Sequence, residues 1–196
     1  MTDKTPNEPQ ETRLTAEDSQ SAYAVLNDIF GNINEQLRFA EAKNGALLTL
    51  NLAVVFGIAS LMGDYASVMS NPVEVAMIAA ASGCGVAAIV SLVSFLPELH
   101  PRKRPAKVLV DPSNIFFFGH IRAHSETQYL NLVYAGLGLK TGQPLAAHLH
   151  LANQIGTNSN NAHKKFRFFA AGAGITLLSL VVPALILGVL RALGYV

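Results

Sequence analysis

Residues 168–190 read FFAAGAGITLLSLVVPALILGVL and contain no charged side chain. Two further segments, residues 44–63 and residues 75–97, share this property. Each is close in length to the roughly 20 apolar residues that a helix needs to cross a hydrocarbon layer about 30 Å thick. Because a charge at the centre of such a helix costs about 2.5–3.5 kcal/mol, three uncharged segments predict three transmembrane helices. The alternative is a soluble all-α domain with three buried helices, but soluble cores seldom leave helices apolar on every side.

The composition of the chain also favours a membrane protein. Charged residues make up 14% of the sequence and hydrophobic residues 51%, whereas about 25% of an ordinary soluble domain is charged. The net charge is +1, so bulk charge gives no reason to expect a nucleic-acid partner. The single cysteine, Cys84, lies in the second uncharged segment. It can form no internal disulfide, and we interpret it as a small packing residue.

Basic residues are distributed unevenly between the loops. Of the 14 Lys and Arg residues, four precede the first uncharged segment, nine lie between the second and the third, and only Arg191 follows the third. The loop 64–74 has none. The positive-inside rule therefore places the N-terminus and residues 98–167 in the cytoplasm, and the loop and the C-terminus on the opposite side.

A periodic apolar pattern precedes the first span. Residues 1–17 are mostly polar, and we expect them to be disordered. Residues 18–43 are predicted to form a cytoplasmic helix with one apolar face. The residues on this face are Tyr23, Leu26, Phe30, Ile33, Leu37 and Ala40. The same register continues through Asn44 and Asn51, so we expect one unbroken helix that enters the membrane.

Leu37, Asn44 and Asn51 are the candidate coupling and packing residues of this helix. An amide inside a transmembrane helix usually bonds to a neighbouring helix, a contact worth about 1 kcal/mol. A second interpretation is that Asn51 fixes the register of a helix pair that changes on activation.

Residues 98–167 are predicted to form a cytoplasmic sensing module. The module begins with a basic linker rich in proline, which we interpret as an anchor to anionic headgroups. A helix is expected from Ser125, as its cap, to Lys140, and another leads from Pro144 toward the third span. The predicted fold is therefore an all-α membrane protein. It has three transmembrane helices and a cytoplasmic bundle formed by the N-terminal helix and the module 98–167.

No catalytic or metal-binding pattern is recognisable in the sequence. His120 and His124 have a spacing that can bind zinc on a helix, but no third ligand with suitable spacing follows. His148 and His150 would point to different sides of a helix. No phosphate loop, nucleophile elbow or pair of catalytic carboxylates is present. We therefore expect no enzyme activity, no metal and no cofactor.

Several stretches of the sequence, taken in order, resemble a known family. They are FAEAKNGALLTLN at 39–51, NIFFFGHI at 114–121 with a later Tyr129, LANQI at 151–155, residues 158–161, and KKF at 164–166. Together they resemble the transmembrane effectors of bacterial Pycsar anti-phage systems. The resemblance runs from about Ala22 to the C-terminus.

The resemblance implies a partner and a mechanism. In such systems an adjacent pyrimidine cyclase makes cyclic UMP (cUMP) or cyclic CMP (cCMP) on infection. The effector senses this messenger and damages the inner membrane, which causes abortive infection. By this resemblance we expect a multi-pass inner-membrane protein that forms a homo-oligomer. The positive-inside rule then places its N-terminus in the cytoplasm and its C-terminus in the periplasm.

Two other functions stay open at this point. One is a structural or adaptor inner-membrane protein whose cytoplasmic bundle docks a partner. The other is a small transporter or channel subunit, which the absence of ionisable groups within the spans disfavours.

A cyclic mononucleotide needs a cation for its phosphate, polar donors and an apolar or aromatic wall. On the cytoplasmic side these residue types coincide best at 114–129. The candidate ligand-binding residues there are Asn114, Phe117, Phe118, Arg122 and Tyr129. Arginine suits the phosphate because its planar fork can hold two oxygens at once. The alternative is that the phenylalanines belong to a core and that Arg122 is a solvated or headgroup-facing charge. The stretch 38–44 beside the membrane is the second place where a site is expected.

Overall fold

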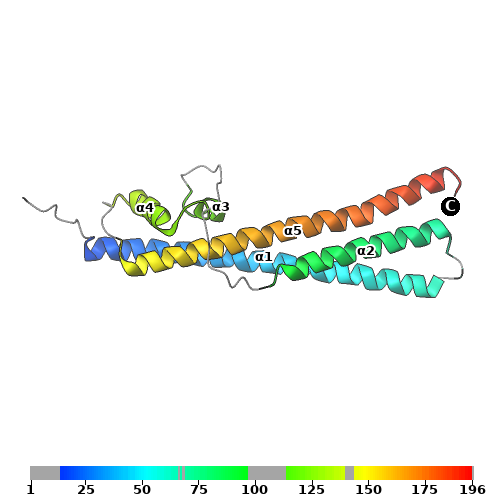
Figure 1. Ribbon diagram of the computed structural model, residues 1–196, viewed down its shortest axis with the longest axis horizontal. Coiled ribbons are helices and arrows are strands. Elements are labelled where there is room, and N and C mark those ends of the chain that lie inside the picture. The colour runs from blue at the N-terminus through cyan, green and yellow to red at the C-terminus, as the bar shows by residue number, and fades with distance from the viewer. Residues whose placement is uncertain (1–13, 66, 68, 97–113, 140–143, 196) are drawn as a thin grey trace, which may run out of the picture. The chain divides into compact units, whose positions relative to one another are not determined.

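The computed structural model describes residues 14–65, 67, 69–96, 114–139 and 144–195. This part of the chain contains five helices, labelled in Figure 1. They are α1 (Ala16–Tyr65), α2 (Asn71–Val93), α3 (Phe118–Ile121), α4 (Glu126–Gly136) and α5 (Ala146–Ala192). No strand occurs among these residues, so the all-α prediction is confirmed. The helix α1 begins at Ala16, two residues before the predicted start, and residues 1–13 and the basic linker lie outside the described ranges.

The helices α1, α2 and α5 are each long and apolar enough to cross a membrane, as the three uncharged segments predict. In α2, Pro72 lies in the first turn, where its missing N–H costs no helical hydrogen bond. In α5, the helix continues through Pro183.

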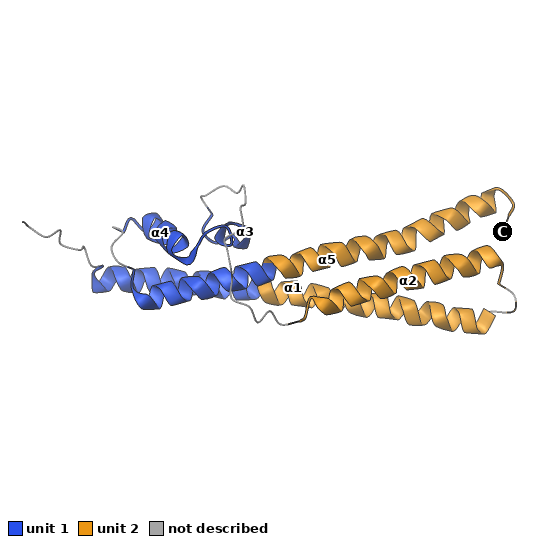
Figure 2. Cartoon of the chain, viewed as in Figure 1, with its two compact units in different colours: residues 1–36, 100–162 blue, residues 37–99, 163–196 orange. Residues whose placement is uncertain are grey.

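The chain forms two compact units, coloured in Figure 2. Unit 1 comprises residues 1–36 and 100–162, and unit 2 comprises residues 37–99 and 163–196. The helix α1 enters unit 2 at Leu37, and α5 enters it at His163. Because α1 is one uninterrupted helix, the prediction that the N-terminal helix continues into the first span is confirmed.

Unit 1 has an apolar core formed by residues of α1, α3, α4 and α5. The fully or almost fully buried members are Ala22, Leu26, Ile29, Ile33, Ile121, Tyr129, Leu130, Val133, Tyr134, Ala152 and Ile155. The predicted register of α1 was partly wrong, since Tyr23 is 46% exposed. The buried face of this helix is centred on Ala22, Leu26, Ile29 and Ile33, which turns Tyr23 to its edge.

The start of α4 follows the predicted cap. The Ser125 hydroxyl accepts a hydrogen bond from the Gln128 backbone N–H at 3.3 Å, and the Ser125 N–H donates to the Gln128 side chain at 3.0 Å. This reciprocal pair is a capping box, which satisfies two backbone donors at a helix start. The helix ends at Gly136, four residues before the predicted end. Gly138 follows with φ 69°, a left-handed conformation that favours glycine.

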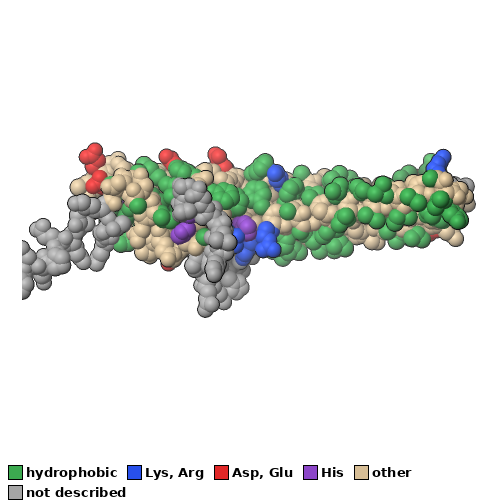
Figure 3. All heavy atoms as spheres, turned by 90° about the horizontal axis from the view of Figure 1, so that it is seen from above, with side chains coloured by type: hydrophobic (Ala, Val, Ile, Leu, Met, Phe, Trp, Pro, Cys, Tyr) green, Lys and Arg blue, Asp and Glu red, His purple; other side chains and the backbone are tan. Residues whose placement is uncertain are grey.

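Unit 2 buries small side chains between its three helices. On α2 the buried residues are Ala76, Ala80, Cys84, Ala87, Ala88 and Ser91. Small residues let helix backbones approach closely where lipid removes the hydrophobic driving force. At Gly172 of α5, an added Cβ would lie 3.0 Å from Leu47 of α1 and 3.3 Å from Ser91 of α2. Large hydrophobic side chains of the spans instead lie on the surface (Figure 3).

Candidate functional site

The predicted ligand-binding residues lie around α3 in unit 1. The Asn114 side-chain oxygen accepts a hydrogen bond from the Phe116 N–H at 3.0 Å, which shapes the turn before the helix. Phe117 is the N-cap residue of α3, and its ring lies 4.8 Å from that of Phe118. Asn114 and Phe117 are exposed and Phe118 is partly buried. The structure therefore brings these three residues into one short segment with an accessible aromatic face.

Arg122 ends α3 as its C-cap residue and is partly buried. It is the one Lys or Arg residue among the described residues of unit 1. Five acidic residues are described in the same unit, and they are Glu17, Asp18, Asp28, Glu35 and Glu126. An anion that binds to the described part of this unit would therefore meet one permanent positive charge.

Tyr129 is 1% exposed and belongs to the core of unit 1. Its hydroxyl donates a hydrogen bond to the Ile115 carbonyl at 2.8 Å. Burial raises the pKa of this phenol, so it stays a neutral donor. Because the inward face of α4 carries Tyr129, its side chain supports the turn 114–118 from the core side.

Sequence reasoning missed a buried histidine in unit 1. The His148 Nδ1 atom lies 2.7 Å from the Tyr134 hydroxyl, and its Nε2 atom lies 3.5 Å from the Ser19 hydroxyl. The Tyr23 ring stacks on the imidazole at 6.1 Å. One side chain of α5 therefore contacts α1 and α4 together. Burial lowers the pKa of His148, because desolvation disfavours the imidazolium.

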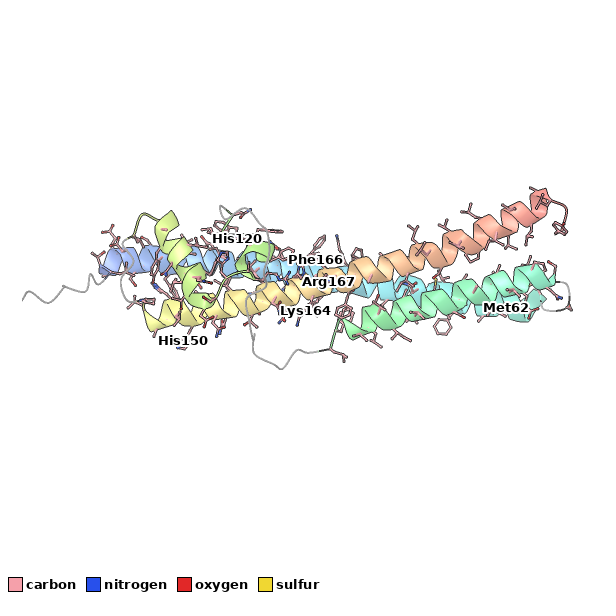
Figure 4. The ribbon with its side chains drawn as sticks, turned by 45° about the horizontal axis from the view of Figure 1, so that its top comes forward. Met62, His120, His150, Lys164, Phe166 and Arg167 are labelled. Carbon is pink, nitrogen blue, oxygen red and sulfur yellow. The ribbon has the colours of Figure 1, made fainter. Side chains whose placement is uncertain are left out.

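The spacing along α5 carried the missed signal. His148 lies four residues before Ala152 and seven before Ile155, both of which are buried. A histidine in register with an apolar face is buried with it. His150, labelled in Figure 4, is exposed because it lies two residues further along the helix.

The predicted coupling residues Asn44 and Asn51 are fully buried in unit 2, and Leu37 is partly buried. The Asn44 side-chain N–H₂ donates to the Ala40 carbonyl of α1 at 2.9 Å and to the Lys165 carbonyl of α5 at 3.0 Å. Its oxygen has no hydrogen-bond partner among the residues that the structure describes.

Asn51 makes a second contact between α1 and α5. Its N–H₂ donates to the Leu47 carbonyl at 2.8 Å, and its oxygen lies 3.0 Å from the Thr176 hydroxyl. That hydroxyl is also 2.9 Å from the Gly172 carbonyl, so its single proton serves two acceptors. Both amides therefore connect α1 with α5, and the contact of Asn51 with a neighbouring helix agrees with the prediction.

Other hydroxyl groups of the spans bond within their own helix. The Ser91 hydroxyl donates to the Ala87 carbonyl at 3.0 Å, and the Ser179 hydroxyl donates to the Ile175 carbonyl at 2.7 Å. These bonds satisfy the hydroxyl protons without a partner from another helix.

Lys165 of α5 contacts the other two long helices of unit 2. Its ammonium group donates to the Ser94 carbonyl at 2.8 Å, where α2 ends, and lies 3.2 Å from the Glu41 carboxylate of α1. The Phe95 ring is 5.5 Å away. A cation at a helix C-terminus is favourable because the last carbonyls lack helical partners. We call Lys165, Glu41, Ser94 and Phe95 the Lys165 junction. The sequence had suggested only a positive-inside charge for Lys165.

Residues 25–192 match the family model described as the Pycsar effector protein domain. The chain belongs to the Pycsar effector family. The match begins in the first helix of this Pycsar effector and ends at the last residue of α5, so it covers α3, both buried amides and the Lys165 junction.

Comparison with curated proteins and with solved structures gave no match to this Pycsar effector. Among its described residues, no group of three or more His, Cys, Asp or Glu side chains could hold a metal ion. With three helices that could span a membrane, the chain is a membrane effector of anti-phage defence.

Proposed function

We propose that cUMP or cCMP activates this Pycsar effector, which then impairs the integrity of the inner membrane and causes abortive infection. The single observation that carries the proposal is the family match, which extends across both units and all three potential spans. The messenger comes from an adjacent pyrimidine cyclase, and the effector acts without catalysing a reaction. Its N-terminus lies in the cytoplasm, its C-terminus lies in the periplasm, and it works as a homo-oligomer.

The proposed messenger site is the segment around α3. Arg122 pairs with the phosphate, the rings of Phe117 and Phe118 form a wall for the base, and Asn114 supplies an amide. Support comes from charge, since Arg122 is the one basic side chain among the described residues of unit 1 apart from histidines. Tyr129 supports this segment through its bond to Ile115.

The proposed transmission uses the two helices that contribute to both units. The helices α1 and α5 are continuous, so a change in unit 1 can alter their rotation or spacing in unit 2. The contacts that resist such a change are Asn51 with Thr176 and the Lys165 junction. Loss of these contacts would open the helix packing that Gly172 allows.

The test is release of dye from liposomes that contain the purified full chain. We expect cUMP or cCMP to trigger release, whereas 5′-UMP, which lacks the cyclic phosphodiester, should not. Arg122→Ala should abolish both nucleotide binding and release, while Arg191→Ala, an equal loss of charge outside unit 1, should preserve both. Unchanged affinity of Arg122→Ala in calorimetry would place the site outside α3. No release with any cyclic pyrimidine nucleotide would contradict the effector function and favour the adaptor alternative.

A further inference from the structure

Three aromatic rings surround one ammonium group beside the first span. The Lys43 Nζ atom lies 4.5 Å from the centre of the Phe39 ring, 5.2 Å from that of Phe169 and 6.0 Å from that of Phe166. Phe39 and Lys43 belong to α1, and the other two rings belong to α5. Figure 4 labels Phe166 together with Lys164 and Arg167 on the same part of α5. We call Lys43 and these three rings the Lys43 cage.

The charge of the Lys43 cage is not balanced by an acid within the described part of unit 2. Lys43 makes only ring contacts with the described residues. Glu41, two residues away, is paired with Lys165 at 3.2 Å. Ring faces attract a cation, but they do not neutralise it, so the ammonium can still take an anion on its open side. Lys43 is only partly buried, and Phe39 is 55% exposed, so that side is accessible.

The residues around the Lys43 cage indicate which kind of anion it binds. Lys43 directly precedes the uncharged residues 44–63, so it lies where a span begins. Leu48 and Leu50 follow on α1, partly buried and exposed respectively, and Phe168 on α5 is partly buried. A ligand at this place would meet a cation and aromatic faces at one end and an apolar helix surface beyond. A phospholipid has this distribution, with an anionic phosphodiester joined to acyl chains.

We propose that the Lys43 cage is a binding site for the phosphodiester of an anionic phospholipid, on the surface that residues of α1 and α5 form together. The headgroup phosphate pairs with the Lys43 ammonium, and the rings of Phe39, Phe166 and Phe169 hold that ammonium in place and cover the glycerol region. The acyl chains follow the apolar surface of the two helices. The site differs from the messenger site at α3 and does not depend on it.

The experiment is native mass spectrometry of the full chain in a neutral detergent, titrated with phosphatidylglycerol or with zwitterionic phosphatidylcholine. We expect retention of phosphatidylglycerol in preference to phosphatidylcholine. Lys43→Gln should weaken retention about fivefold or more, since one lysine beside an anionic lipid surface contributes about that factor. Lys43→Arg should preserve it, because arginine keeps both the charge and the ring contacts. Phe39→Leu keeps an apolar side chain without a ring face, and should reduce retention less than Lys43→Gln.

The matched control is Arg38→Gln, which removes one charge from the same helix at an exposed position outside the cage. Retention by this variant should equal that of the unmodified chain. An equal loss in Arg38→Gln and Lys43→Gln would overturn the proposal, because diffuse charge would then explain the binding. Displacement of phosphatidylglycerol by free cUMP would also overturn it, since the cage would then serve the messenger phosphodiester. Circular dichroism of each variant checks that the helices are intact.

Discussion

In unit 1 most buried side chains are large and apolar, such as Ile33, Leu130 and Ile155, whereas in unit 2 most are small or polar, such as Ala80 and Asn51. On the surface the distribution of large apolar and polar side chains is the opposite. Large apolar side chains of unit 2 such as Phe56, Ile89 and Leu185 lie on the surface, while the surface of unit 1 carries Glu17, Asp28 and Glu35.

This difference between the buried and exposed side chains indicates that unit 1 is adapted to water and unit 2 to lipid. In water, burial of apolar area stabilises a fold, so the large hydrophobic residues collect inside. In lipid that driving force between helices is absent, and close packing of small residues and hydrogen bonds between helices take its place. The continuous helices α1 and α5 have one part in each unit, so each helix follows the rule for water in unit 1 and the rule for lipid in unit 2. Neither helix therefore has one apolar face from end to end.

The largest effect should come from core truncation in unit 1. Ile33→Ala should destabilise that unit by about 2–5 kcal/mol, because it removes buried methyl groups and leaves a cavity. Phe56→Ala removes a larger side chain from a position that is 69% exposed, so it should change stability little. Hydrogen exchange of the α4 amides under increasing urea measures the first effect, and unfolding of the spans in SDS measures the second. Comparable losses for the two variants would contradict the comparison.

A substitution at Leu37, where α1 enters unit 2, tests whether messenger binding in unit 1 can be separated from membrane damage by unit 2. Leu37→Pro should cost about 3 kcal/mol, because proline removes a helical N–H and clashes with the preceding turn. We expect the variant to bind the messenger but not to release dye from liposomes, while Leu37→Ala should do both. Full release by Leu37→Pro would show that α1 does not transmit the signal.

The sequence was sufficient to predict three helices that could span a membrane and the helical cap at Ser125, since these depend on local composition. It was also sufficient for the contact of Asn51 with a neighbouring helix, because this residue follows the register of the buried face of α1. The burial of His148 and the Lys165 junction were not predicted. Both depend on partners that lie far away in sequence, such as Ser19 for His148 and Ser94 for Lys165. Tyr23 was misplaced because a heptad pattern leaves its neighbour Ala22 equally acceptable on the apolar face.

A smaller effect should follow from loss of the polar contact in the spans. Asn51→Leu should destabilise the packing of α1 on α5 by about 0.6 kcal/mol, the average contribution of a hydrogen bond between membrane helices, and by no more than about 1.7 kcal/mol. Thr176→Val removes the partner hydroxyl at nearly constant volume. A double-mutant cycle with unfolding in SDS gives the coupling energy of the pair. A coupling energy of zero would show that the 3.0 Å contact contributes nothing to stability.

The smallest effect near neutral pH should come from His148. Because burial lowers its pKa below the ordinary value of 6.5, the unfolded chain binds this proton more readily than the folded one. Unit 1 should therefore have its full stability above about pH 6.5 and lose stability as the pH falls toward the lower pKa of the folded state. Hydrogen exchange of α4 over this range provides the measurement. His148→Gln should remove this pH dependence and His150→Gln should retain it; the opposite pattern would assign the titration elsewhere.

The neutral character of the buried polar groups in unit 2 has a consequence for ion permeation. Asn51, Ser91 and Thr176 are dipoles, and the three uncharged segments contribute no ring of charge to the inner faces of the helices. Channels that choose between cations and anions do so with charged rings or with carbonyl filters of fixed geometry. A water-filled passage lined by these side chains would conduct both signs. In a potassium chloride gradient its reversal potential would lie close to zero, so the effector would discharge a cell's ion gradients together.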